Sequence, residues 1–467
     1  MSDEAGAPEN PVGRCELRSP PPAWVSVIVL VVGDVVVLSA MLALGIIFRQ
    51  WLGRWLPIEI SGTMMLGLFL ATLCLPLGYA AAQLYPGYGQ SPVERLRARV
   101  MVTLSGFGAM ILFDHLAQDG QWSRGVLLGV VLLSVVIIPL WDRVAVDVMV
   151  RRHLWGEGVL VAGSPGRRRR LVAILNAQPE LGWVPAREAE IEDAPTSREK
   201  AIAVAFVVLP PNILGTDLNV EDFPFRQVIL VPEVEGVQGH WVRALALGSS
   251  LGLQIQRNLL VRRNRLLKRA FDVVVAALLL TLTVPAMALA AAAVRAVSVG
   301  PVLFVQERIG FRGKAFRMWK LRTMRADAED TLAQVIEADP QVNAHWQHSM
   351  KIAWDPRVVP VVGRFLRRFS IDELPQFWNV LRGEMSLVGP RPLPDYHLRR
   401  LSPLAIHLRQ QVLPGITGLW QISGRSETGL EEQERLDVYY VRNWSLWLDI
   451  HILSRTLSAV LGGRGAE

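Results

Sequence analysis

Long apolar runs constrain this chain more than any other feature of its sequence. The first covers residues 24–48 and contains one charged residue, Asp34. A run of about 25 residues is long enough to cross a bilayer as a helix. Three further runs cover residues 62–84, 100–113 and 125–141. The sequence therefore predicts four transmembrane helices within residues 23–150, although the third run needs its flanks to span. A carboxylate at membrane depth usually faces other helices, so we expect Asp34 to be a buried packing contact.

The charges beside these runs predict how the chain is oriented. Arginines gather before the first run, between the second and third, and after the fourth, whereas the loop before the fourth carries only Arg124. The positive-inside tendency places the N-terminus and everything after Arg143 in the cytoplasm, although Arg49 and Arg54 oppose it. The net charge of +7 indicates contact with anionic lipid rather than with nucleic acid, because the basic residues border apolar runs. Residues 1–22 begin acidic and proline-rich, which predicts a disordered tail and no cleavable signal peptide.

Residues 151–260 change to the composition of a soluble domain. Apolar strands are expected at residues 158–162, 201–209 and 227–231, with a helix at 167–177. Alternation of strands and helices predicts a small α/β domain with a parallel sheet. The turn Gly163-Ser164-Pro165-Gly166 resembles a dinucleotide-binding loop but is degenerate, because Pro165 has no N–H to offer a pyrophosphate. Arg167 to Arg170 could hold a phosphate instead, and a solvated basic patch is the favoured alternative.

Residues 265–298 form a fifth apolar segment of unusual character. Lys268 and Arg269 precede it, Arg295 follows it, and Pro285 lies in its middle. Basic residues at both ends favour the same cytoplasmic side. A proline inside a helix removes a hydrogen bond and promotes a kink. We therefore predict a re-entrant membrane helix broken at Pro285, with a straight, mildly kinked spanning helix as the alternative.

The densest group of polar motifs follows in residues 299–467. The stretch S-I-D-E-L-P-Q places two carboxylates, Asp372 and Glu373, side by side. The surrounding motifs supply basic residues, namely Lys320, Arg367, Arg368 and Arg391. One interpretation is purely structural, because Ser370-x-x-Glu373 matches a helix capping box. The other is phosphoryl transfer, which needs a nucleophile and guanidinium groups that neutralise phosphate. An aspartate can be that nucleophile, and a neighbouring glutamate can hold Mg²⁺ against a diphosphate.

Several ordered motifs from Lys268 to the C-terminus resemble those of the bacterial sugar transferase family. They are K-R-A-F-D from Lys268, Q-E-R-I-G from Gln306, K-L-R-T-M from Lys320, S-I-D-E-L-P-Q from Ser370, M-S-L-V-G-P-R-P from Met385 and P-G-I-T-G-L-W-Q-I-S-G-R from Pro414. These enzymes are monotopic polyprenyl-phosphate sugar-1-phosphate transferases. The N-terminal part, with L-Y-P-G-Y at Leu84, is similar to the long-form members that start exopolysaccharide or O-antigen synthesis. So many motifs in one order make a chance match very improbable.

The resemblance implies a specific set of site residues. Asp372 would attack the sugar-bearing phosphate of a UDP-hexose, and Glu373 would be its Mg²⁺-associated partner, so both would lie at the metal. Arg391 and Arg367 would bind phosphate, Lys320 would support the acidic site, and Arg425 would lie near the nucleotide. Three more side chains are expected to contact phosphate or substrate: Arg322, Arg368 and Gln421. The family often has Ser-Pro at the bend of its membrane helix, where this chain has Val284-Pro285.

The resemblance also implies the architecture and the partners. The expected class is a membrane protein of α and α/β parts. It would combine a four-helix transmembrane bundle, a degenerate Rossmann-like domain, and a mostly helical monotopic catalytic domain with a re-entrant helix. Glucose or galactose would be the transferred hexose, and undecaprenyl phosphate in the bacterial inner membrane would be the acceptor. A homodimer is expected, and UMP would leave before the lipid enters.

Other interpretations of the sequence stay open at this point. The chain could be a catalytically silent membrane scaffold or regulator of polysaccharide assembly, or a nucleotide sensor built on the α/β domain. His345 and His348 lack partners at metal-ligand spacing, so we interpret them as surface residues. Residues 439–460 mix Trp444, Trp447 and Leu448 with arginines. That pattern suits either a helix lying on the bilayer surface or a core helix.

Overall fold

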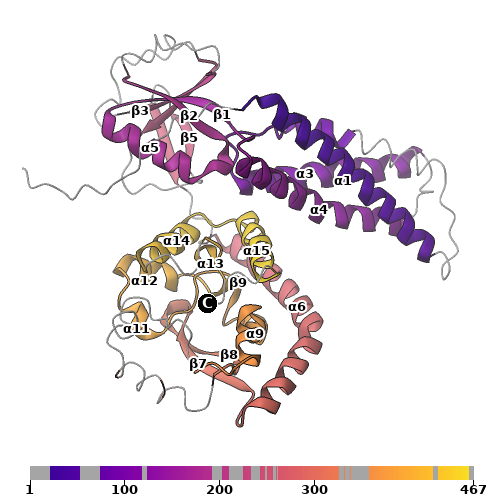
Figure 1. Cartoon of the computed structure of the whole chain (residues 1–467), viewed down its shortest axis with the longest axis vertical. Helices are drawn as coiled ribbons and strands as arrows, with labels where there is room; N and C mark the ends of the chain where they lie inside the picture. Colours follow the sequence, from indigo (N-terminus) through magenta and orange to yellow (C-terminus); the bar gives the residue numbers. More distant parts are fainter. Residues whose placement is uncertain are drawn as a thin grey trace, which may run out of the picture. The chain divides into compact units, whose positions relative to one another are not determined.

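The structure is a computed structural model, and it falls into two units, residues 1–236 and residues 237–467. The parts of the chain that it describes are residues 21–52, 74–117, 124–191, 202–209, 225–232, 242–247, 250–255, 259, 261–324, 331, 337, 357–423 and 430–461. Figure 1 traces the chain from indigo at the N-terminus to yellow at the C-terminus. Each unit is described by itself below. The expected tail falls, apart from its last two residues, outside the described residues, as do His345 and His348.

Three long helices of the first unit correspond to predicted transmembrane segments. They are α1 (Ala23–Leu52), α3 (Pro92–Ala117) and α4 (Arg124–Arg151). Each is long and apolar enough to cross a membrane. The second predicted segment lies mostly outside the described residues, and its described part is helical from residue 74. The third run was expected to need its flanks, and α3 indeed starts earlier than the run. Its start is fixed by a capping box, in which the Glu94 carboxylate accepts from the Ser91 N–H at 2.8 Å.

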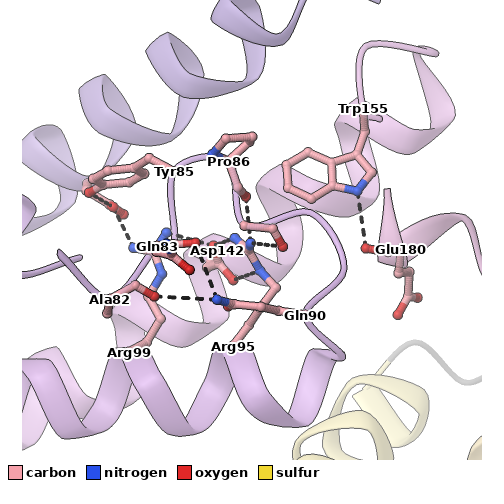
Figure 2. A network of polar contacts seen from close by, with 12 residues as sticks. Ala82, Gln83, Tyr85, Pro86, Gln90, Arg95, Arg99, Asp142, Trp155 and Glu180 are labelled. Atoms are coloured by element: carbon pink, nitrogen blue, oxygen red, sulfur yellow. Dashed lines mark hydrogen bonds and ion pairs between the residues drawn. The ribbon is translucent and has the colours of Figure 1, made fainter. Parts of the chain in front are cut away.

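A buried ion network joins these three helices (Figure 2). Arg99 of α3 is fully buried and donates to Asp34 of α1 at 2.5 Å and to Asp142 of α4 at 2.7 Å. Arg95, one turn earlier, donates to the same Asp142 oxygen at 2.5 Å. The Tyr85 hydroxyl donates to Asp34 at 2.5 Å. Two arginines and two aspartates neutralise each other, which is what burial of charge requires. The prediction that Asp34 is a buried packing contact is confirmed.

The L-Y-P-G-Y stretch connects this bundle to the α/β domain within the first unit. Arg95 donates to the Pro86 carbonyl at 2.7 Å and lies over the Trp155 ring at 5.3 Å. Trp155 in turn donates from its indole N–H to the Glu180 carbonyl at 3.2 Å, as Figure 2 shows. The Tyr88 hydroxyl donates to Ser26 of α1 at 3.0 Å. The α/β domain is thus fastened to the ends of the long apolar helices by aromatic and polar contacts.

The α/β domain contains a four-stranded parallel sheet in the order β2-β1-β3-β4. Its elements are β1 (Glu157–Ala162), α5 (Pro165–Ala177), the 3-10 turn η1 (Pro179–Leu181), β2 (Trp183–Ala189), β3 (Val204–Leu209) and β4 (Gln227–Pro232). The predicted parallel sheet is confirmed, with the predicted strands at β1, β3 and β4. Strand β2 was missed because it holds one buried residue and a proline. Arg168 donates to the carbonyl of Gly163 at 3.0 Å, so it is engaged with the degenerate loop itself.

The second unit contains short strands and helices packed along one long helix, α6 (Arg262–Val297). Before it comes the hairpin β5 (Val242–Leu247) and β6 (Ser250–Ile255). After it come β7 (Leu303–Ile309), η5 (Phe311–Gly313), β8 (Ala315–Leu321), α9 (Val362–Arg368), η6 (Ile371–Glu373), α10 (Gln376–Arg382), β9 (Ser386–Val388), α11 (Asp395–Leu398), α12 (Pro403–Gln410), β10 (Gly415–Thr417), α13 (Leu419–Ile422), α14 (Leu430–Arg442) and α15 (Leu446–Leu461). The expectation of a mostly helical catalytic region agrees with this content.

Helix α6 continues through Pro285 as one helix. It is long and apolar enough to cross a membrane, and little of it is buried by protein. In Figure 1 its ribbon curves instead of running straight. Thr281 and Thr283, just before the proline, donate their hydroxyls to the carbonyls of Ala277 at 2.9 Å and Leu279 at 2.7 Å. The predicted return of this helix to the same membrane side stays a prediction.

One turn of α6 fastens the helix to the rest of the second unit. The Lys268 ammonium donates to Asp449 of α15 at 2.7 Å. Arg269 donates to the carbonyls at the end of α10, with a distance of 2.6 Å to that of Val380. The Asp272 carboxylate accepts from the Ser386 hydroxyl of β9 at 2.7 Å. The K-R-A-F-D motif therefore attaches the apolar helix to three separate elements.

The C-terminal stretch consists of two helices, α14 and α15, that belong to the core. Trp444 and Leu448 are buried, and the Trp444 indole donates to Asp449 at 3.0 Å. The Tyr440 hydroxyl also donates to Asp449, at 2.8 Å. Of the two interpretations of residues 439–460, the core helix is therefore correct for these buried side chains. Trp444 and Leu448 pack against protein, so these two side chains are not available to contact lipid.

Candidate active site

The end of strand β8 supplies three polar side chains with different tasks. Lys320 donates to the Glu373 carboxylate at 2.8 Å. The Thr323 hydroxyl, just beyond the strand, accepts from the guanidinium of Arg367 at 2.9 Å. Arg322 instead donates to the carbonyls of Ser298 and Val299, both at 2.9 Å. Lys320 and Thr323 thus organise the acidic pair and its arginine, whereas Arg322 holds the turn that follows α6.

The carboxylate pair lies in a 3-10 turn between two helices. Ser370, ahead of it, has a positive φ of 53° and caps neither helix with its side chain. The capping-box interpretation is therefore wrong, because the Glu373 carboxylate accepts from Lys320 and Arg391 and not from the Ser370 N–H. Helix α10 begins at Gln376, so the pair lies just ahead of a helix N-terminus as Pro375 indicated.

Helix α10 is fixed to strand β8 by a buried amide that the sequence did not point to. The Asn379 side chain accepts from the Trp319 N–H at 3.1 Å and donates to the Arg317 carbonyl at 2.7 Å. It also donates to Glu384 at 2.7 Å. An amide has a limited set of donors and acceptors, and this one uses both its oxygen and its nitrogen. The distance between Lys320 and the carboxylate pair is set in this way.

Glu373 and Asp372 differ sharply in environment. One oxygen of Glu373 accepts from both Lys320 and Arg391, at 2.8 and 2.7 Å. Burial alone would raise the pKa of Glu373, but Arg391 and Lys320 lower it well below its usual range. Asp372 is 8% exposed, and within the described part of the chain no hydrogen bond to it is found. Burial and the neighbouring Glu373 raise the pKa of Asp372 to about 6, against the lowering effect of Lys320, Arg367 and Arg391.

Arg391 projects from a loop that is held by backbone-to-backbone packing. Strands β9 and β10 pair in parallel, and Gly415 N–H donates to the Pro390 carbonyl at 3.0 Å. A Cβ on Gly415 would lie 2.1 Å from the nitrogen of Gly389, so neither motif tolerates a side chain there. The glycines of the two motifs therefore allow two stretches of backbone to meet behind the loop. The loop in turn presents Arg391 to Glu373.

The remaining predicted site residues are not all brought to the pair. Arg368 is exposed and lies over the Phe369 ring at 5.8 Å. Gln421 is buried and donates to the Ile416 carbonyl at 3.2 Å, next to β10. Arg425 falls outside the described residues. The structure therefore groups Asp372 and Glu373 with Lys320, Arg367 and Arg391, and it gives Arg322 a contact of another kind.

The carboxylates suit a metal that shares its ligands with a substrate. Among the described residues, three or more metal-ligating side chains never converge on one point. Mg²⁺ usually binds through one or two carboxylates together with substrate phosphates, and it needs no cage of protein ligands. Asp372 and Glu373 are the right number and kind of donors for such a site. The two carboxylates therefore fit Mg²⁺ that is bound jointly with a diphosphate.

Comparison with known proteins places these residues in a recognised context. The family model of bacterial sugar transferases matches residues 263–463. A UDP-galactose-lipid carrier transferase of Erwinia amylovora is 31% identical over 79% of this chain and 81% of its own length. The undecaprenyl-phosphate galactose phosphotransferase of Salmonella typhimurium is 30% identical over 74% of this chain and 77% of its own length.

A third relative is more similar over a shorter part of the chain. The UDP-glucose:undecaprenyl-phosphate glucose-1-phosphate transferase of Escherichia coli is 45% identical over 42% of this chain and 40% of its own length. The relatives of this chain thus include proteins named for galactose and a protein named for glucose. Likeness at this level does not separate the two hexoses, which differ in the orientation of one hydroxyl.

Proposed function

This chain belongs to the bacterial sugar transferase family, and from that premise we propose that it moves hexose 1-phosphate from a UDP-hexose to undecaprenyl phosphate. Transfer of a sugar phosphate to a polyprenyl phosphate is the activity that its relatives' names describe. The observation that carries the proposal is a pair of carboxylates beside three cations, in which Glu373 is ion-paired and Asp372 has no hydrogen bond from the described residues. The products would be undecaprenyl-diphosphate-hexose and UMP, at the start of exopolysaccharide or O-antigen synthesis.

The chemistry we propose proceeds in two displacements. A carboxylate oxygen of Asp372 attacks the sugar-bearing phosphorus of the donor, an O–P bond forms, and the bond to UMP breaks. An oxygen of undecaprenyl phosphate then attacks the same phosphorus and releases the Asp372 carboxylate. Arg391 and Arg367 would hold the phosphate by charge-assisted contacts, which keep the reacting atoms in line. Because donor and acceptor occupy the site in turn, UMP can leave to water before the lipid head group enters.

A bound Mg²⁺ would offset the negative charge of the donor diphosphate, and this charge neutralisation would be its contribution. Asp372 and Glu373 would hold it together with phosphate oxygens. The side chains of this chain do the rest. Lys320 and Arg391 keep Glu373 ionised, and the same two cations lower the barrier for a dianionic donor to approach Asp372.

The membrane elements are proposed to bring the site to the bilayer surface. Helix α6 is apolar over most of its length, and its K-R-A-F-D turn is fastened to α10 and β9, the two elements that flank the site residues. If α6 enters and leaves on the cytoplasmic side, the carboxylate pair faces the cytoplasm, where nucleotide sugars occur. We propose this arrangement for the inner membrane, with N-terminus and site both cytoplasmic, and with a homodimer as the assembled form.

Labelled donor tests the two-step reaction directly. Purified enzyme given UDP-hexose and Mg²⁺ without lipid carrier should retain label covalently at Asp372 and release about one equivalent of UMP per site as a burst. UDP-glucose and UDP-galactose are compared in parallel, because the burst identifies the hexose. Active enzyme without burst or trapped label would favour direct attack by the lipid phosphate. Absence of UMP release from every UDP-sugar, with carrier present, would leave the silent scaffold as the better account.

A further inference from the structure

The direction in which Arg391 leaves its loop depends on residues that touch neither carboxylate. Pro390 and Pro392 flank Arg391, and each proline fixes its own φ. The peptide plane after Arg391 is then the main remaining freedom of the loop. Its carbonyl accepts a hydrogen bond from the guanidinium of Arg409. That contact therefore holds the loop at Arg391, next to the backbone hydrogen bond that Gly415 donates to the Pro390 carbonyl.

Arg409 is itself held in place by a second buried charge. It lies in α12, is 8% exposed, and donates from its other guanidinium nitrogen to Asp437 of α14, which is 2% exposed. A guanidinium presents its donors in a fixed fork, so one arginine can hold a carboxylate and a carbonyl at once. Burial raises the pKa of Asp437 to about 6, although Arg409 lowers it. The carboxylate is thus still ionised at neutral pH, when the site would work.

Energetics argue that this pair has a task beyond holding the fold. A buried ion pair costs desolvation and is often no more stable than well-packed apolar residues. The core around α12 and α14 is apolar, and its buried residues include Leu393, Leu401 and Ala405. Apolar side chains at 409 and 437 would suit that core. They could not, however, bind the carbonyl of Arg391.

We infer that Arg409 and Asp437 are positioning residues for donor binding. Asp437 orients the guanidinium of Arg409, Arg409 fixes the carbonyl of Arg391, and Arg391 is thereby aimed at Glu373 and at the donor phosphate. The inference rests on the proposed function, because it assigns Arg391 to that phosphate. It adds two residues of α12 and α14 that neither the motifs nor the comparisons assign a role.

Arg409→Lys in the full-length protein separates positioning from folding. A lysine can keep the charge pair with Asp437, but its single ammonium lacks the fork that also reaches the carbonyl. In UMP-release assays the KM for UDP-hexose should rise about tenfold, the usual size for a lost hydrogen bond to a charged group. The value of kcat per titrated active site should change much less. Arg399→Lys is the matched control, because Arg399 pairs with Asp395 on the exposed surface nearby, and it should leave both constants unchanged.

A double-mutant cycle shows whether the effect passes through Arg391. Arg409→Lys should add little to the loss of donor affinity that Arg391→Lys already causes, since residues acting in series are not additive. An unchanged donor KM, or fully additive effects of the two variants, would overturn the inference. The inference would also be overturned if the variant lost only total activity, in proportion to the number of folded active sites. If the wild-type enzyme released no UMP, the proposed function itself would be wrong. The results with the variants, in contrast, test only the positioning role of Arg409.

Discussion

Replacing Asp372 by Asn should stabilise the protein at the same time as it abolishes turnover. The carboxylate has a pKa of about 6 in the folded chain against an ordinary value of 3.8, chiefly because it is buried and next to Glu373. A carboxyl group with a raised pKa favours folding fully below its unfolded pKa, and that contribution is lost as pH rises through about 6. At pH 8 the ionised form therefore costs about 3 kcal/mol, which an uncharged amide of equal size would not.

The assay is thermal unfolding of the detergent-solubilised protein without donor or Mg²⁺, at several pH values. At pH 8 the Asn variant should melt up to about 10 °C above the wild type, using the usual relation between Tm and free energy for a unit of this size. At pH 5 the advantage should be roughly half as large, and near pH 4 it should become small. UMP release by the variant should be absent throughout.

Glu373→Gln is the matched variant, with the opposite sign expected. The pKa of Glu373 is lowered by Arg391 and Lys320, so its charge stabilises the fold at neutral pH. Its loss leaves two half-buried cations uncompensated, which costs about 1–3 kcal/mol. If Asp372→Asn instead lowered Tm at pH 8, or if its effect did not vary with pH, the carboxylate would be paired. The assignment of Asp372 as a strained nucleophile would then be wrong.

Three further outcomes are expected. The value of kcat/KM for the donor should rise with pH along a limb centred near 6, because only ionised Asp372 attacks; a limb near 4 would mean that the site does not perturb this group. Cysteines placed near Lys268 and Pro301 should both be labelled from the cytoplasmic side only, and periplasmic labelling of the second would show that α6 crosses the membrane. Arg99→Met should destabilise the bundle by about 3–5 kcal/mol, because it leaves the buried Asp34 carboxylate without a cation, whereas Asp142 keeps Arg95. Adding Asp34→Leu should recover part of that loss, and no recovery would contradict the pairing.

Periodicity and turn residues were enough to predict much of the fold. The run G-V-L-V-A corresponds to β1, because a buried parallel strand reads as a continuous apolar run. The helix expected at 167–177 corresponds to α5, which begins two residues earlier, at Pro165. Strand β2 could not be found in this way. Its residues W-V-P-A-R-E-A are only partly buried, and its place at the sheet edge comes from pairing with β1. Edge strands of this kind carry little signal in one sequence.

The candidate site shows the same division between chemistry and placement. Motifs identified Lys320, Arg322 and Arg391 as basic groups near an acidic pair, but not which of them would reach it. Lys320 is the last residue but one of β8, and Arg322 follows directly after the strand. One binds Glu373, whereas the other binds carbonyls after α6. The residue types show that both side chains are positively charged. Which group each of them binds depends on how the neighbouring elements pack beside the end of β8.

The opposite pKa directions of the two carboxylates explain how an anionic nucleophile can work on an anionic donor. Lys320, Arg367 and Arg391 carry three positive charges against two carboxylates, so the site is net positive even when Asp372 is ionised. Glu373 holds two of these cations in fixed positions before the donor arrives, which removes the cost of organising them during the reaction. Asp372 makes no comparable contact with the described residues, so in the proposed reaction it would break no such contact in order to attack. Adjacent groups with divergent environments commonly take divergent roles. In the reaction we propose, that division would give charge placement to Glu373 and bond formation to Asp372.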